Sequence, residues 1–121
     1  ASAANYLKKM GWKKNSHCFY KIDLKNNISK KYLNVSAKEL VNKRKLKYFK
    51  KYISNYKDVE FIDDNLKVAI ITPDKDIIPN AETLYPAYIV FENYEIILKW
   101  NRSLRFALAV CTLKNKINNE L

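Results

Sequence analysis

Residues 86–117, PAYIVFENYEIILKWNRSLRFALAVCTLKNKI, form the most apolar part of the chain and end in its clearest helical pattern. Four apolar side chains near the end recur at spacings of 4, 3 and 4 residues, which places them on one face of an α-helix. They are Phe106, Val110, Leu113 and Ile117. Ser103 stands just before this pattern, where its hydroxyl can accept from the exposed N–H groups of a first turn. The sequence therefore predicts a C-terminal helix with Ser103 as its N-cap.

An aromatic ring, an amide and a cation precede this cap in the run Lys99-Trp100-Asn101-Arg102. The combination suits a neutral ligand rich in hydroxyl or amide groups, such as a sugar. In the alternative interpretation, Trp100 is a core anchor and Asn101 is a turn residue. Composition alone favours the alternative, because buried aromatics beside helix caps are common.

Two sequence blocks at opposite ends of the chain resemble signatures of the lytic murein transglycosylase B family. From Asn93 onward the chain resembles N-F-x-V-I-L-x-[WY]-N-R-S-x-x-Y-A-x-A-V-x-x-L, and from Ser2 onward it resembles S-A-A-N-Y-L-x-x-x-G-W. The motif positions to which we assign structural roles are Ser2, Asn5, Tyr6, Gly11, Trp12, Asn93 and Ser103. The middle of the chain matches the family only loosely.

The resemblance implies an α+β fold in which lysozyme-like helical elements at both ends flank a small β-containing insertion. The resemblance also implies that the chain is the C-terminal portion of the protein and a fragment of a larger domain. Residues 1–16 would end the helix block of a catalytic domain, residues 17–85 would form an inserted α/β subdomain, and residues 86–121 would line a glycan cleft.

Members of this family cleave the β-1,4 bond between N-acetylmuramic acid and N-acetylglucosamine in peptidoglycan. The muramyl C6 hydroxyl attacks and leaves a 1,6-anhydro sugar, while one glutamic acid acts first as acid and then as base. None of the six glutamates of this chain stands in the family's E-[ST]-x-[FY]-G type motif. The resemblance therefore places the catalytic residue upstream of Ala1 and implies that this chain alone is inactive.

By resemblance, Trp100 and Asn101 occupy the family's [WY]-N pair beside the bound glycan. Trp100 would stack on a pyranose ring, and Asn101 would bond an acetamido group or orient the catalytic glutamate. Arg102 would meet a lactyl or peptide carboxylate, although an exposed arginine is more often only solvated. Phe106 stands where the family usually has tyrosine, so a hydroxyl is missing there. The expected partner is the peptidoglycan glycan strand in the periplasm or cell envelope, with a membrane anchor only through an upstream region.

The net charge of +11 is concentrated in residues 8–57, which carry 16 Lys and Arg against two acids. Lysines alternate with aromatic residues over residues 43–56, as in proteins that bind single-stranded nucleic acid. The alternative is an amphipathic helix with its aromatics in the core and its lysines in water. With 20 Lys against 3 Arg and no nucleic-acid-binding motif, we favour the helix and expect no nucleic-acid partner. The acidic turns lack EF-hand spacing, and we expect neither a metal nor a cofactor.

The sequence also predicts the other elements. We expect a helix over residues 1–10 closed by Gly11, and strands over residues 18–24, 66–71 and 88–91. Ser36 and Glu39 form a capping box, which predicts a helix from about Ala37 with Leu40 and Val41 on its apolar face. We further expect residues 59–62 to pair with residues 66–71 as a hairpin. Periodicity leaves residues 93–100 open between strand and helix, and the resemblance implies a helix.

Cys18 and Cys111 are the only cysteines, and their spacing fits no metal site. Cys111 falls within the C-terminal helix, where a thiol packs as a small hydrophobic group. Sequence alone does not show whether their Cα atoms lie close enough for a disulfide. Two buried free thiols are the default expectation.

Overall fold

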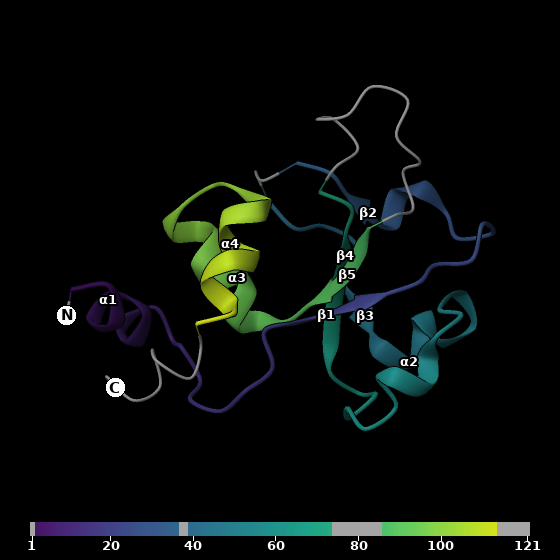
Figure 1. Ribbon diagram of the computed structural model, residues 1–121, viewed down its shortest axis with the longest axis horizontal. Helices are drawn as coiled ribbons and strands as arrows, with labels where there is room; N and C mark the ends of the chain where they lie inside the picture. Colours follow the sequence, from purple (N-terminus) through teal and green to yellow (C-terminus); the bar gives the residue numbers. More distant parts are fainter. Residues whose placement is uncertain (1, 37–38, 74–85, 114–121) are drawn as a thin grey trace.

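The computed structural model describes residues 2–36, 39–73 and 86–113. Three helices, α1 (Ser2–Lys9), α3 (Glu92–Trp100) and α4 (Leu104–Cys111), gather on one side of a five-stranded sheet (Figure 1). The short helix α2 (Leu46–Phe49) lies on the other side, together with the 3-10 turns Lys30–Tyr32, Lys50–Tyr52 and Tyr56–Asp58. The fold is α+β and lysozyme-like, as the resemblance implied.

The sheet has the order β1-β5-β4-β2, and β3 pairs with the first residues of β4. Its strands are β1 (Phe19–Ile22), β2 (Leu33–Asn34), β3 (Arg44–Lys45), β4 (Lys67–Ile71) and β5 (Ala87–Val90). All pairs are antiparallel except β2 with β4. The strands predicted over residues 18–24, 66–71 and 88–91 are therefore confirmed as β1, β4 and β5.

Strand β4 separates two hydrophobic cores, because successive side chains of a strand point to opposite faces. Ala69 and Ile71 pack with the three long helices, whereas Val68 and Ile70 pack with α2 and the 3-10 turns. All four side chains are buried, which explains why this strand reads as a continuous apolar run. The sheet thus divides the helix block from the part formed by the middle of the chain.

Helix α1 ends in a Schellman motif at Gly11, as the sequence predicted. Gly11 has φ = 98°, its N–H donates to the Lys8 carbonyl at 3.2 Å, and the Trp12 N–H donates to the Leu7 carbonyl at 2.9 Å. The turn directs Trp12 back into the core that contains Leu7. Only a residue that tolerates a left-handed backbone closes the helix in this way.

We expect Gly11→Ala to lower the free energy of unfolding by about 1–2 kcal/mol, the cost of a left-handed backbone for an L-residue. A Cβ built on Gly11 meets no heavy atom within 4 Å, so the backbone conformation alone carries this cost. Urea unfolding of the two proteins measures the effect. Gly11→Asn is the matched control and should lose less, since asparagine enters this region more readily. Equal losses for both variants would contradict the explanation.

The helix predicted from Ala37 is wrong for residues 39–43, while Ala37 and Lys38 lie outside the described residues. The buried amide of Asn34 accepts from the Val41 N–H at 2.8 Å and donates to the Val41 carbonyl at 3.1 Å. Asn42 then adopts φ = 57°, and helical structure begins only at Leu46. A tertiary contact to a neighbouring strand therefore overrides the local capping signal.

The hairpin predicted for residues 59–62 is also wrong. The Val59 N–H donates to the Tyr56 carbonyl at 3.0 Å, and the Ile62 N–H donates to the Val59 carbonyl at 3.1 Å, which makes this segment a series of tight turns. Val59 and Ile62 are both buried at a spacing of three residues. The strand they were expected to join, β4, pairs with β5 on one edge and with β2 and β3 on the other.

The C-terminal helix is confirmed as α4, and the Ser103 hydroxyl accepts from the Phe106 N–H at 3.1 Å. The face that α4 buries differs from the predicted one. Its buried residues are Leu104, Ala107 and Cys111, whereas Phe106 and Leu113 are exposed. Ile117 lies outside the described residues. Residues 93–100 fall within helix α3, as the resemblance implied.

Candidate functional site

Three aromatic side chains meet at the surface where α1, α3 and α4 come together. The Trp100 ring centroid lies 6.0 Å from that of Tyr6 and 6.1 Å from that of Phe106. Trp100 is 42% exposed and Phe106 is 38% exposed, so Trp100 is not the core anchor of the alternative interpretation. We call Tyr6, Trp100 and Phe106 the aromatic surface.

Asn101 and Arg102 are exposed beside this surface because the chain leaves α3 at Asn101. The Asn101 N–H still donates to the Ile97 carbonyl at 3.0 Å, but its backbone is extended, with φ = −140° and ψ = 114°. The Ser103 N–H donates to the Asn101 carbonyl at 2.8 Å before α4 begins. The break between the helices therefore presents an amide and a guanidinium at the surface, next to an indole.

Asn93 connects the two blocks of sequence that carry the family resemblance. Its side chain is buried, accepts from the Lys13 N–H at 2.9 Å and donates to the Lys13 carbonyl at 2.9 Å. The segment after Gly11 and Trp12 is thereby fixed to the first turn of α3. In the next position, the Tyr94 hydroxyl donates to the Leu104 carbonyl at 2.9 Å, and burial raises the pKa of this hydroxyl.

We expect Asn93→Ala to lower the free energy of unfolding by about 2–4 kcal/mol, because two hydrogen bonds are lost and backbone groups of Lys13 lose their partner. Asn101→Ala is the matched control: its side chain is exposed, so its stability should stay within about 0.5 kcal/mol of the original protein. Urea unfolding checks both variants. If Asn93→Ala were as stable as Asn101→Ala, the role assigned to Asn93 would be wrong.

Cys18 and Cys111 form a disulfide, which joins the residue before β1 to the end of α4. Their Cα atoms lie 6.0 Å apart, within the usual range for this bond. The default expectation of two free thiols is therefore wrong. The two residues are 93 positions apart, and only the folded chain shows their proximity.

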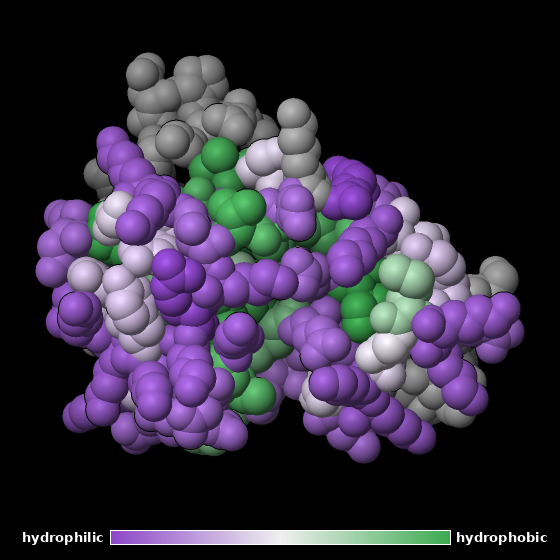
Figure 2. Space-filling view, turned by 180° about the vertical axis from the view of Figure 1, so that it is seen from behind, coloured by the Kyte–Doolittle hydropathy of each residue, from purple (hydrophilic) through white to green (hydrophobic). Residues whose placement is uncertain are grey.

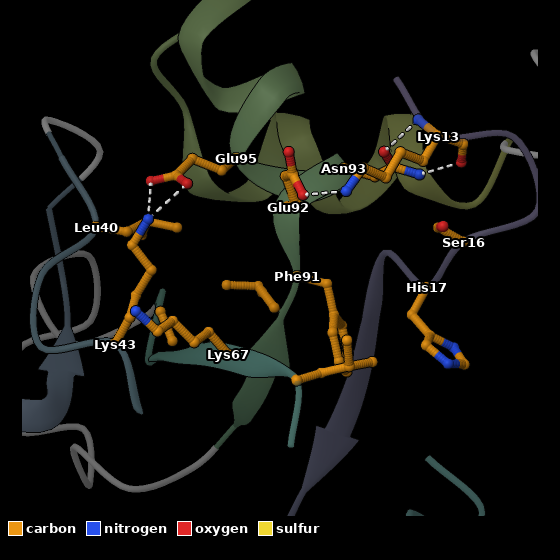
Figure 3. Close-up of a pocket in the computed structure, with 13 residues that line it drawn as sticks. Lys13, Ser16, His17, Leu40, Lys43, Lys67, Phe91, Glu92, Asn93 and Glu95 are labelled. Atoms are coloured by element: carbon orange, nitrogen blue, oxygen red, sulfur yellow. Dashed lines mark hydrogen bonds and ion pairs between the residues drawn. The ribbon is translucent and has the colours of Figure 1, made fainter. Parts of the chain in front are cut away.

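An open hollow of about 510 Å³ lies between α3, strands β4 and β5, and two connecting segments (Figure 3). Lys43 Nζ donates to Glu95 Oε1 at 2.7 Å and to Glu95 Oε2 at 3.0 Å. Lys13 Nζ lies 3.0 Å from Glu92 Oε2. The apolar lining is Leu40, Leu66, Ala69, Val90 and Phe91, and the remaining lining residues are Lys13, Ser16, His17, Lys43, Lys67, Glu92, Asn93 and Glu95.

A second hollow of about 520 Å³ adjoins the first. It is lined by Glu39, Leu40, Lys43, Glu95, Leu98, Lys99 and Arg102. Leu40, Lys43 and Glu95 line both hollows. The sequence gives no sign of these hollows, since their walls come from segments that lie far apart in the chain.

The lysine- and tyrosine-rich segment 43–56 does not form one amphipathic helix. Leu46 and Phe49 are buried, as that interpretation requires, but Tyr48 is exposed and shares a hydrogen bond of 2.8 Å with the Tyr32 hydroxyl. Arg44 and Lys51 lie 6.0 Å and 5.8 Å from the Tyr48 ring centroid. Cations of the protein itself thus lie close to Tyr48, the most exposed aromatic ring of this segment.

Residues 2–36, 39–73 and 86–113 contain no group of three His, Cys, Asp or Glu side chains that could hold a metal ion. No helix among these residues has the length and apolar character needed to cross a membrane.

Residues 1–115 match the family model described as the transglycosylase SLT domain. The chain therefore belongs to this family. No curated protein matches the sequence significantly.

Solved structures of similar fold include two lytic transglycosylases from Pseudomonas aeruginosa. The soluble lytic transglycosylase SltB1 has a TM-score of 0.63 and 16% identity, over 98% of this chain and 35% of that chain. SltB3, in complex with NAG-anhNAM-pentapeptide, has a TM-score of 0.63 and 23% identity, over 97% of this chain and 29% of that chain. The present chain thus spans about a third of the length of these structures.

Proposed function

We propose that this chain is the C-terminal part of a lytic murein transglycosylase of the B family. The parent protein would cleave the β-1,4 bond between N-acetylmuramic acid and N-acetylglucosamine and release 1,6-anhydromuropeptides. The observation that carries the proposal is the aromatic surface, exposed beside Asn101 and Arg102 in a chain of the SLT family. The complex of SltB3 with a fragment that contains an anhydro sugar supports this class of product.

Four residues in or beside the aromatic surface have a chemical role in this proposal. Trp100 offers a ring face to a pyranose, and Phe106 extends the apolar area without the usual hydroxyl. Asn101 provides an amide for an acetamido group or for orienting the catalytic acid. Arg102 provides a guanidinium for a lactyl or peptide carboxylate. Peptidoglycan strands are the partner, and no cofactor is required.

The catalytic glutamate in this proposal lies upstream of Ala1. Protonating a glycosidic oxygen requires a carboxylic acid within hydrogen-bond reach of that oxygen. The two carboxylates of α3 face lysines instead, with Glu92 beside Lys13 and Glu95 beside Lys43. In the parent protein, residues 1–16 would end the helix block of the catalytic domain, residues 17–85 would form the inserted subdomain, and residues 86–121 would line the cleft.

The cell envelope or periplasm is the proposed location. A disulfide such as Cys18–Cys111 persists in oxidising compartments, which include the bacterial periplasm. Peptidoglycan also lies in the periplasm, so the proposed substrate and the disulfide indicate the same compartment.

Digestion of purified peptidoglycan sacculi tests the function. A protein that carries these residues and the sequence encoded upstream should release muropeptides with 1,6-anhydro ends, detected by chromatography and mass spectrometry. Residues 1–121 alone should release none. Products with reducing ends would indicate hydrolysis instead, and activity of residues 1–121 alone would show that the catalytic acid has been misplaced.

A further inference from the structure

We propose that a cluster of cations and tyrosines around α2 binds the surface of an anionic phospholipid membrane. The cluster lies on the side of the sheet away from the aromatic surface, so this inference stands apart from the proposed glycan site. It consists of three cations and the three tyrosine rings that they contact, and we call it the basic cluster. Its members are Lys31, Arg44, Lys51, Tyr32, Tyr48 and Tyr52.

The tyrosine rings form one connected array. The Tyr48 ring centroid lies 5.6 Å from that of Tyr32 and 6.4 Å from that of Tyr52. The hydroxyls of Tyr32 and Tyr48 share a hydrogen bond of 2.8 Å. Leu46 and Phe49, on the same short helix as Tyr48, are buried and hold this helix against the sheet. The array is therefore fixed by tertiary packing, and Tyr48 reaches the surface with 40% of its side chain exposed.

Three cations surround the array, and each comes from a different element. Lys31 belongs to the 3-10 turn before β2, Arg44 to β3, and Lys51 to the 3-10 turn after α2. The Tyr32 ring centroid has Lys31 Nζ at 5.2 Å and Arg44 Cζ at 5.8 Å. The Tyr48 ring centroid has Arg44 Cζ at 6.0 Å and Lys51 Nζ at 5.8 Å. All three cations are exposed, and none has a carboxylate within ion-pair distance among the residues that the structure describes.

The segment around the basic cluster adds further positive charge. Residues 43–57 carry seven Lys and Arg and no Asp or Glu, and all seven cations are exposed. Nearby acids act at the other end of this segment, where burial and the carboxylates of Asp64 and Glu60 raise the pKa of Tyr56. Figure 2 is seen from behind, and hydrophilic side chains predominate in its left half, the side on which α2 lies. Such a surface attracts an anionic partner.

An anionic bilayer matches the chemistry of the basic cluster. Each Lys or Arg held near an anionic membrane surface adds to the attraction. Tyrosine combines an apolar ring with a polar hydroxyl and is enriched at membrane–water interfaces. A bilayer presents many charges in one plane and requires no fixed geometry, which suits lysine ammonium groups on flexible stems. The exposed cations and the half-exposed Tyr48 ring therefore favour a membrane surface as the partner.

Single-stranded nucleic acid fits the basic cluster less well. Its bases stack on open faces of aromatic rings. Arg44 and Lys51 lie over the Tyr48 ring, and Lys51 Nζ also lies 5.1 Å from the Tyr52 ring centroid. A base that stacked on Tyr48 or Tyr52 would displace the cations that its phosphates need. Phospholipid headgroups can contact the same cations and leave them over the rings.

Binding through the basic cluster leaves the aromatic surface accessible. Tyr6 packs with the core that the three long helices cover, whereas Leu46 and Phe49 belong to the core on the other face of the sheet. The helices α1, α3 and α4 and the short helix α2 thus lie on opposite sides of the sheet (Figure 1). A chain bound to a membrane in this way would turn Trp100 away from the bilayer.

Sedimentation with phospholipid vesicles tests the inference. Residues 1–121 should bind vesicles that contain phosphatidylglycerol and should not bind vesicles of phosphatidylcholine alone. Added salt should weaken the binding, because ions screen the attraction between exposed charges. Absence of binding to phosphatidylglycerol vesicles at low ionic strength would overturn the inference. The assay contains no peptidoglycan, so its result does not depend on the proposed function.

Replacing Lys31, Arg44 and Lys51 by glutamine tests the assignment to the basic cluster. Each substitution should lower the partition into anionic vesicles about 5-fold, and the three together should lower it about 100-fold. Thermal unfolding verifies that the triple variant remains folded. The ratio between this variant and the original protein should be the same when both carry the upstream sequence.

A second triple variant matches the change in net charge. It replaces Lys8 and Lys9 at the end of α1 and Lys14 in the following turn by glutamine, and all three are exposed on the helix side of the protein. This variant should lose less than about 3-fold in partition, since its cations lie away from the bilayer. Equal losses in the two triple variants would show that total charge drives the binding and would overturn the basic cluster.

Tryptophan fluorescence reports which side of the protein faces the bilayer. Trp12 and Trp100 are the only tryptophans, and Trp12 is buried. Emission should keep its wavelength when the protein binds, and brominated phospholipids should not quench it. A blue shift with quenching would place Trp100 in the membrane and overturn the proposed orientation. Displacement of the vesicles by a single-stranded oligonucleotide that loses affinity in the Lys31, Arg44 and Lys51 variant would assign the cluster to nucleic acid instead.

Discussion

Replacing Cys18 and Cys111 together by alanine is expected to lower the free energy of unfolding by about 3–5 kcal/mol. The disulfide spans 93 positions, and closing so long a loop restricts the unfolded chain strongly. Both residues are buried, and alanine places no polar group in the space they leave. At about 3–6 °C per kcal/mol for a domain of this size, the melting temperature should fall by roughly 10–25 °C.

Thermal unfolding with and without a reductant separates the disulfide from other effects of the substitution. The original protein should melt near the temperature of the double variant once it is reduced, while the variant should not respond to the reductant. A thiol assay on the unfolded protein confirms reduction. If the fully reduced protein kept its melting temperature, the disulfide would have no part in stability.

Asn101→Ala and Trp100→Ala are expected to lower turnover of peptidoglycan about 10- to 100-fold in the protein that carries the upstream sequence, because both remove a group that positions the sugar. The Asn101 side chain is exposed, so its loss should leave the free energy of unfolding unchanged. Trp100→Ala also removes the ring contacts to Tyr6 and Phe106, so its free energy of unfolding should fall as well. Trp100→Phe retains a ring face and should lose less than Trp100→Ala.

Lys45→Ala provides the reference for this experiment. Lys45 is exposed on β3, outside the aromatic surface and both hollows, and its loss should change turnover less than twofold. Anhydromuropeptide release per unit time is the measurement. Equal turnover of Asn101→Ala and Lys45→Ala would contradict the proposal that Trp100 and Asn101 line the cleft.

The parts of the fold that depend on local chemistry were predictable from the sequence. Gly11 ends α1 because a left-handed residue is required there, and Ser103 caps α4 because its hydroxyl reaches the first turn. Strand β4 (Lys67–Ile71) was predictable because Val68, Ile70 and Ile71 have high β-propensity and stand in a continuous apolar run, and its last four residues are buried.

The wrong helix and hairpin predictions share one physical cause, which is that contacts made outside the segment itself changed its local structure. The amide of Asn34 holds Val41 and prevents the helix that the capping box favoured. Val59 and Ile62 resemble a strand in composition, yet both edges of β4 are already paired. No local pattern contains this information.

In the candidate site too, some features were predictable from the sequence and others depend on contacts between distant segments. Resemblance identified Trp100, Asn101 and Phe106, and the structure places Trp100 and Phe106 together with Tyr6 from the other end of the chain. The resemblance only marked Asn93 as a motif position, and its partner, the backbone of Lys13, is known from the structure alone. The two hollows could not be predicted, because each is lined by residues from segments that lie far apart in the chain.

The contacts of Asn93 and Cys111 have a consequence for variation in this chain. Asn93 holds Lys13, and Cys111 holds Cys18, so the polypeptide is fastened to α3 and α4 immediately before β1 begins. Insertions or deletions in the turns around Asn26 or Asp63 then change the length of the middle segment while its point of attachment stays fixed. The lengths of these turns can thus vary while Asn93 and the disulfide keep the start of β1 in a fixed place against α3 and α4.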